Sequence, residues 1–171
     1  IMSPKSLLRN KRAVSSKEDF VNGSTFHRVL WDDAEKGNSI TKLQKDSKIK
    51  RVVICSGKIY FDLLNEREQR EISDIYLLRL EQFYPFPALS FIKELSRFKD
   101  AEFVWCQEEP KNQGGWSFVD PNLEWSLKRI KAKYKRARYI GRAAAASPAT
   151  GLATQHKKQQ EMIINEALTI D

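Results

Sequence analysis

The strongest candidate for chemistry in this sequence is the four-residue run Cys55-Ser56-Gly57-Lys58. It lies between a short apolar run, which predicts a strand, and a segment of helical period. A turn of small residues at such a junction leaves backbone N–H groups free at the helix N-terminus, where an anion can bind. The run matches neither a Walker motif nor Gly-x-Gly-x-x-Gly. An ordinary tight turn is the simpler interpretation, and contact with a phosphate or effector is the alternative.

A second candidate is the acidic and glycine-containing run from Glu108 to Trp116. It follows another predicted strand, and ligands of open α/β sheets gather at the carboxyl ends of strands. Paired carboxylates can act in acid–base catalysis. Since no histidine is near in sequence, we expect an ion-paired loop whose glycines precede a helix.

Histidine and cysteine offer little for a metal or catalytic site. His27 and His156 lie far apart, and neither has a second metal ligand at close spacing. Cys55 and Cys106 each lie in an apolar run, so we expect buried, unreactive thiols. Nothing resembles a nucleophile elbow. The sequence therefore predicts no catalytic residue and no metal site.

The chain is basic, with formal charge +8 from 30 Lys and Arg against 22 Asp and Glu. Basic residues are densest from Lys128 to Arg138, which makes nucleic-acid binding tempting. On a helix, however, Ile130 and Tyr134 would share one face, with the lysines on the solvent side. We therefore expect the end of a helix whose basic side chains face solvent, and no nucleic-acid partner.

The elements that position these residues follow from apolar periodicity. Four short runs read as strands buried on both faces: 51–55, 75–80, 102–106 and 138–141. The segments between and after them have helical stripes: Ile59, Tyr60, Leu63 and Leu64; Leu89, Ile92, Leu95 and Phe98; Trp116 to Ile130, broken near Pro121; and Leu152, Ile163, Ile164, Ala167 and Leu168.

Alternating strands and helices predict parallel βαβ units in a three-layer α/β/α sandwich. A further strand, Phe26 to Trp31, comes first, and Asp32 to Lys48 reads as a mobile surface loop. We expect an N-terminal arm and linker over residues 1–25 and one domain over 26–171.

Length and composition fit one globular domain. The chain has 171 residues, of which 41% are hydrophobic and 30% charged. No apolar run is long enough to cross a membrane, and no signal peptide opens the chain, which favours an intracellular compartment. The opening Ile1-Met2-Ser3-Pro4 looks like a cut through a larger protein.

Six segments in consistent order resemble the C-terminal region of the thiamine-dependent decarboxylase subunit of 2-oxoglutarate dehydrogenase. They are Met2 to Arg9, Phe26 to Leu30, Cys55 to Tyr60, Glu81 to Pro87, Trp105 to Asn112 and Gly141 to Gly151. The chain has Ala143 and Ala145 where the family usually has proline and serine, which relaxes that loop.

The resemblance implies a transketolase C-terminal-like fold: a mixed five-stranded sheet in which the first strand is antiparallel and the strands of Cys55 and Cys106 are neighbours. It implies a parent enzyme that decarboxylates 2-oxoglutarate with thiamine diphosphate and Mg²⁺ and succinylates lipoyl groups of a succinyltransferase core. The parent would be a homodimer, cytoplasmic in bacteria or in the mitochondrial matrix of eukaryotes. The family's Gly-Asp-Gly diphosphate motif is absent from this sequence, so we expect no cofactor binding by this chain alone.

Two hypotheses follow. The first is a structural domain that supports the dimer, with an effector site near Ser56, Gly57, Lys58 and Gln82. The second is an independent anion- or nucleotide-binding module. The first also predicts exposed apolar side chains that would pack against the rest of the parent, around Met2, Leu7, Leu8, Phe83 and Phe86.

Overall fold

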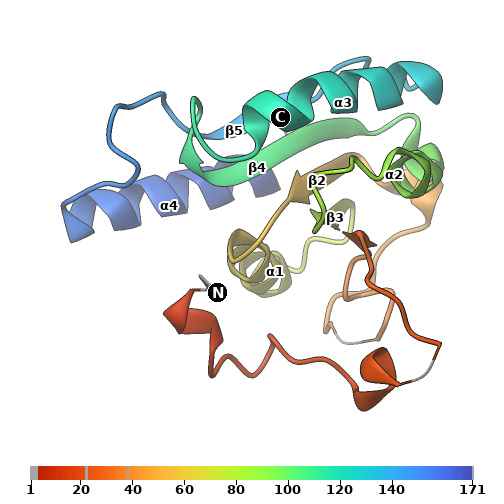
Figure 1. Ribbon diagram of the computed structural model, residues 1–171, viewed down its shortest axis with the longest axis horizontal. Coiled ribbons are helices and arrows are strands. Elements are labelled where there is room, and N and C mark those ends of the chain that lie inside the picture. Colours follow the sequence, from red (N-terminus) through yellow and green to blue (C-terminus); the bar gives the residue numbers. More distant parts are fainter. Residues whose placement is uncertain (1–3, 22, 38, 171) are drawn as a thin grey trace.

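The chain folds around one mixed sheet of five strands. The computed structural model describes residues 4–21, 23–37 and 39–170. The strands are β1 (Val29–Leu30), β2 (Arg51–Cys55), β3 (Ile75–Leu80), β4 (Glu102–Pro110) and β5 (Arg138–Arg142). Their order is β1-β3-β2-β4-β5, and only the β1–β3 pair is antiparallel. The predicted mixed sheet with an antiparallel first strand is confirmed, and Figure 1 shows strands β2 to β5 of this sheet.

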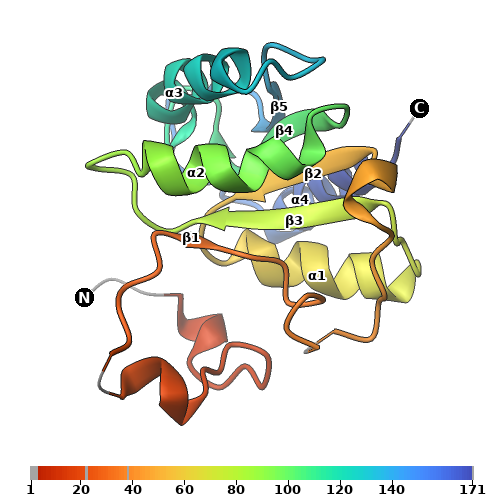
Figure 2. The same cartoon turned by 90° about the vertical axis from the view of Figure 1, so that its right-hand side faces the viewer.

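Helices cover both faces of the sheet. α1 (Ile59–Gln69) and α4 (Ala153–Leu168) pack on one face, and α2 (Ala88–Leu95), η4 (Ser96–Phe98) and α3 (Trp116–Arg129) on the other. Short 3₁₀ turns η1 (Lys5–Leu7), η2 (Lys17–Phe20) and η3 (Asp46–Lys48) lie before β2. Figure 2 shows the sheet between the two helical layers, which confirms the three-layer sandwich.

Side chains along each strand point alternately to the two faces of the sheet, and both faces are covered, which explains why the strand sequences are continuously apolar. Val52 and Ile54 of β2 contribute to the core under α2 and α3, whereas Val53 and Cys55 contribute to the core under α1 and α4. Because both faces are covered by helices, every position needs an apolar side chain. The register pairs Cys55 with Cys106, so the predicted neighbouring cysteine strands are confirmed.

Two predicted strand ranges were wrong. β1 has only Val29 and Leu30, and Phe26 is exposed. Two residues after Leu30, the side chain of Asp32 bonds the Leu77 N–H of β3, which a longer β1 would have to pair. β4 continues past Cys106 to Pro110, because it regains pairing with β5 at Pro110 and Arg142 after an irregularity. The longer β4 carries Glu108 within the strand.

Three predictions about the helices were also wrong. α3 runs through Pro121 without a break, because the proline is on the exposed side of the helix, where the carbonyl it leaves unpaired can reach water. Leu89 and Leu152, which were assigned to apolar stripes, are both exposed. α3 ends at Arg129, so the exposed Tyr134 lies beyond the helix, although Ile130 is buried as expected.

The segment from Asp32 to Lys48 is not a simple surface loop. Asp32 is fully buried and Thr41 nearly so, while Ile40 and its charged neighbours are exposed. The segment covers the edge of β3 where β1 is too short to pair. Its polar, aperiodic sequence does not indicate that Asp32 and Thr41 are buried, so the prediction of a mobile surface loop was wrong for these two residues.

The residues preceding β1 form an arm on the α1 side of the molecule (Figures 1 and 2). Leu8 is exposed, as expected, but Leu7 packs against the core of α1 and α4, and Phe83 and Phe86 pack against the core of α2 and α3. These three side chains are half-buried and keep part of their surface exposed, and Met2 lies outside the described residues. In the part of the chain described here, no helix is both long and apolar enough to span a membrane.

Candidate functional site

The carboxyl ends of β2 and β4 meet at the place where open α/β sheets bind ligands. The helix after β2 lies on one face of the sheet and the helix after β4 on the other, which makes these two strand ends the topological switch point of the sheet. Five polar side chains at the switch point bond one another, and we call them the edge network: Lys58, Asp62, Glu108, Arg142 and Gln160.

Lys58 is the cation of the edge network, and its charge is already balanced. Its Nζ lies 2.7 Å from Glu108 Oε1 and 2.9 Å from Asp62 Oδ2. Burial by itself pulls the pKa of Lys58 down, but the hydrogen bonds to Glu108 and Asp62 outweigh it and hold the pKa above its ordinary value. The ammonium group therefore stays charged and is held by the protein's own carboxylates.

The amide of Gln160 and the guanidinium of Arg142 fasten α4 to this network. Gln160 Nε2 donates to Asp62 Oδ2 at 3.0 Å and to Glu108 Oε1 at 2.9 Å. Arg142 donates to the Glu108 carbonyl and to Gln160 Oε1. The arrangement satisfies these polar groups with internal bonds and joins the turn after β2 to α1, β4, β5 and α4.

The other predicted contact residues flank this network. Gly57 has φ of 75°, which glycine adopts readily, and its turn leads into α1. The amide of Gln82 donates to the Pro85 carbonyl at 2.7 Å. The structure thus places Ser56, Gly57 and Lys58 in one turn, and no bond joins Gln82 to them among the described residues.

Arg79 is a cation at the same sheet edge that the sequence reasoning missed. Its guanidinium carbon lies 4.0 Å from the centre of the Tyr60 ring, and its nearest carboxylate oxygen, on Asp33, is 4.0 Å away. Its Nε is buried and has no hydrogen-bond partner. The signal was in the sequence, because Arg79 interrupts the apolar run Ile75-Tyr76-Leu77-Leu78.

The turn after β4 is built around the buried amide of Gln107. Its Oε1 accepts from the Trp105 indole and the Trp116 N–H, and its Nε2 donates to the carbonyls of Glu109, Pro110 and Gln113. Glu109 is exposed and lies at the turn's surface. The glycines of the second candidate therefore belong to an internally bonded turn, whereas its two glutamates lie at the end of β4.

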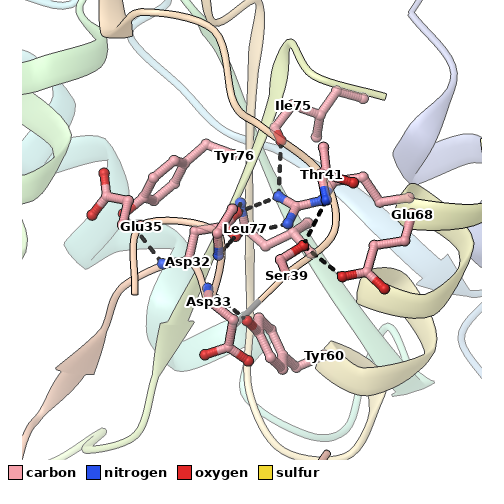
Figure 3. Close-up of polar contacts among 12 residues, drawn as sticks. Asp32, Asp33, Glu35, Ser39, Thr41, Tyr60, Glu68, Ile75, Tyr76 and Leu77 are labelled. Carbon is pink, nitrogen blue, oxygen red and sulfur yellow. Dashed lines mark hydrogen bonds and ion pairs between the residues drawn. The ribbon is translucent and has the colours of Figure 1, made fainter. Parts of the chain in front are cut away.

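A buried ion pair joins Asp32 to Arg67, and Figure 3 shows the polar contacts around Asp32. Both side chains are fully buried. The Asp32 carboxylate accepts two bonds from Arg67, one from the Leu77 N–H at 2.8 Å and one from the Ala34 N–H at 2.9 Å. Because each oxygen accepts from the protein itself, this cluster is structural.

Sequence spacing could have indicated one half of this pair. Arg67 comes three and four residues after Leu64 and Leu63, so it shares their apolar stripe on α1. A lone cation on a buried stripe requires a partner. Asp32 carries no comparable signal, because it stands in a polar, aperiodic segment.

The two cysteines are predicted to be inert in the folded protein. Both are free and buried. Burial raises the pKa of Cys55 from 9.0 to about 12 and holds the pKa of Cys106 well above its ordinary value. A raised pKa leaves less thiolate at pH 8, on the order of a thousandfold less for Cys55.

The measurement is labelling with a chromogenic disulfide reagent at pH 8. We expect almost no labelling of the folded chain and two thiols per chain in urea. Rapid labelling of one thiol before unfolding would show an accessible thiolate that the structure does not contain.

The remaining candidates are surface features. The His27 ring lies against the Trp31 ring at a tilted angle, and His156 lies exposed near Arg142. Lys128 pairs with Glu124, and Arg136 with Asp120, on the solvent side of α3. Within residues 4–21, 23–37 and 39–170, no three His, Cys, Asp or Glu side chains gather closely enough to hold a metal ion.

Sequence comparison relates this chain to known proteins. The family model described as 2-oxoglutarate dehydrogenase C-terminal matches residues 14–168. A 2-oxoglutarate dehydrogenase E1 component from Brucella anthropi is 62% identical over 170 residues, which is 98% of this chain and 17% of that relative. The corresponding protein of Brucella ovis is 61% identical over the same share. The chain thus spans about a sixth of the curated relatives it matches, and it belongs to the family of 2-oxoglutarate dehydrogenase C-terminal domains.

Proposed function

We propose that the chain is the C-terminal structural domain of a 2-oxoglutarate dehydrogenase subunit. The observation that carries the proposal is the 62% identity to an E1 component over nearly the whole chain. A second observation supports a structural role: at the strand ends where open α/β sheets usually bind ligands, the edge network consists of bonds within the protein itself. In this proposal residues 1–25 are an arm and linker, and residues 26–171 are the domain.

The parent subunit would use thiamine diphosphate and Mg²⁺, but the residues of this chain do not fit that cofactor. A diphosphate held through a divalent metal needs carboxylate or amide oxygens free to bind the ion. Asp62 and Glu108, the carboxylates at the strand edge, are held by Lys58 and Gln160. The cofactor would therefore be bound by other parts of the parent.

The wider context is part of the same proposal. The parent would be a homodimer that oxidatively decarboxylates 2-oxoglutarate and passes the succinyl group to lipoyl groups of a dihydrolipoyl succinyltransferase core. The named relatives are bacterial, which supports a cytoplasmic location.

An independent anion-binding module is the second candidate. It would use Ser56, Gly57, Lys58 and Gln82, and the unpartnered Nε of Arg79 at the same edge favours it. The balanced charge of Lys58 weighs against it. Nucleic acid and membrane are not among the proposed partners.

Calorimetry and an activity assay separate the candidates. The complete subunit is expected to bind thiamine diphosphate with Mg²⁺ and to release CO₂ from 2-oxoglutarate, whereas the 171-residue chain is expected to do neither. A complete subunit that binds the cofactor but leaves 2-oxoglutarate unchanged would refute the proposed parent. Tight binding of ADP to the 171-residue chain at physiological salt would favour the independent module.

A further inference from the structure

The N-terminal arm has one side bonded to the domain and one side uncovered. Arg12 donates to Asn65 Oδ1 at 2.6 Å and forms an ion pair with Glu68, both on α1. Leu7 and Ala13 pack against the core under α1 and α4. The arm is therefore bound at a defined position on α1, and it is not a free tail.

The uncovered side is unusually apolar. Of the 13 exposed large hydrophobic side chains among the described residues, five belong to the 19 residues from Leu8 to Phe26. They are Leu8, Val14, Phe20, Val21 and Phe26, and we call them the arm face. Single exposed apolar residues are ordinary, but such a concentration marks an interaction surface.

A second segment with an exposed apolar side chain is fastened to the same anchor. Glu68, which holds Arg12, also accepts hydrogen bonds from the Ser39 hydroxyl and the Ile40 N–H. The side chain of Ile40 is 87% exposed. The arm and this loop are thus fastened to one carboxylate of α1, and both expose apolar side chains.

Charge limits what can cover the arm face. Between residues 4 and 28 there are six basic residues, Lys5, Arg9, Lys11, Arg12, Lys17 and Arg28, and two acidic ones, Glu18 and Asp19. The difference is +4, and Arg12 has the only ion pair to α1 seen for this stretch of described residues. A symmetric contact with a second copy would set these like charges against each other. The surface that covers the arm must be apolar and acidic.

We propose that the arm face is covered by the part of the same polypeptide that precedes it in the complete subunit, through an apolar surface rimmed with carboxylates. This inference rests on the proposed function, and it specifies where the domain docks. The chain spans 17% of the relatives it matches, so a large preceding part exists in them. The arm is covalently joined to that part, which gives the contact a high effective concentration.

Hydrogen–deuterium exchange on the complete subunit tests whether the arm is covered. Amides of residues 8–26 are expected to exchange slowly in the unaltered subunit. They should exchange roughly tenfold faster or more in the Phe20→Ser/Phe26→Ser variant, because burial of two phenylalanines is lost. Leu89→Ser is the matched control: Leu89 is 87% exposed, compared with 79% for Phe20, and lies on α2 across the sheet. Fast exchange of the arm in the unaltered subunit, or equal acceleration in the control, would overturn the inference.

A photo-reactive side chain at position 20 tests which surface covers the arm. Cross-linking is expected within one polypeptide, to a residue that precedes the arm, with the mass of a single subunit on a denaturing gel. A cross-link between two subunits would assign the arm face to a second copy and overturn the proposal. The 2-oxoglutarate assay separates this from the proposed function: an active subunit with an exposed arm refutes the docking surface alone, whereas a subunit that binds the cofactor but is inactive refutes the parent activity.

Discussion

Replacing Asp32 with alanine is expected to destabilise the chain by about 3–5 kcal/mol, because it leaves a buried charge without its partner. Arg67 would remain fully buried without its carboxylate. The Leu77 N–H, which lies on the edge of β3 beyond the reach of the short β1, would lose its acceptor. Urea unfolding monitored by circular dichroism gives the free energy directly.

Asp33→Ala is the matched control for the buried pair. Asp33 is the adjacent residue, but its carboxylate is partly exposed and 4.0 Å from Arg79. Its loss should cost less than about 1 kcal/mol. A double variant, Asp32→Leu with Arg67→Met, should recover part of the loss, because it removes the unpaired charge. Equal costs for Asp32→Ala and Asp33→Ala would contradict a buried structural ion pair.

The second large effect is expected for Arg51, which holds the end of α4. The side chain is 3% exposed, and its Nη1 donates to the carbonyls of Glu166, Ala167 and Thr169. Its Nε pairs with Glu102 at 2.7 Å. α4 has no basic residue in its last turn, so Arg51 supplies the positive charge and the donors that the helix C-terminus lacks.

Arg51→Met should therefore lower the free energy of unfolding by about 3 kcal/mol and loosen α4. Arg138→Met is the control, because Arg138 bonds to the same Glu102 and to Glu166 but is 43% exposed. Its loss should cost less than about 1 kcal/mol. Hydrogen exchange should rise along α4 only in the Arg51 variant. A stable α4 in that variant would show that packing alone holds the helix.

The central residues of the strands, and most of the strand boundaries, could be predicted from the sequence. Val52, Val53 and Ile54 are apolar in succession because both faces of β2 are covered, and such runs are visible in one dimension. The antiparallel first strand and the neighbouring cysteine strands came from the family resemblance, and the structure agrees. Leu89 and Leu152 were placed inside because periodicity marks a face of a helix without showing where that face ends.

The candidate site could be predicted only in part. The Ser56-Gly57-Lys58 turn is where the sequence placed it, at the junction of β2 and α1. Its partner Glu108 lies 50 positions after Lys58, and Gln160, which bonds the same carboxylate, lies 102 positions after it. No local pattern indicates that such distant residues will lie together.

Lys58 shows what the sequence by itself determined and what the tertiary structure decided. Residue types and apolar runs determined the fold class, the turn and the presence of a cation in it, because these depend on neighbouring residues. Only the tertiary structure decided that Glu108 pairs with that cation and that Gln160 bonds the same carboxylate. The physical reason is that charge balance inside a protein depends on separations of a few ångströms in space, which the distance along the chain does not fix.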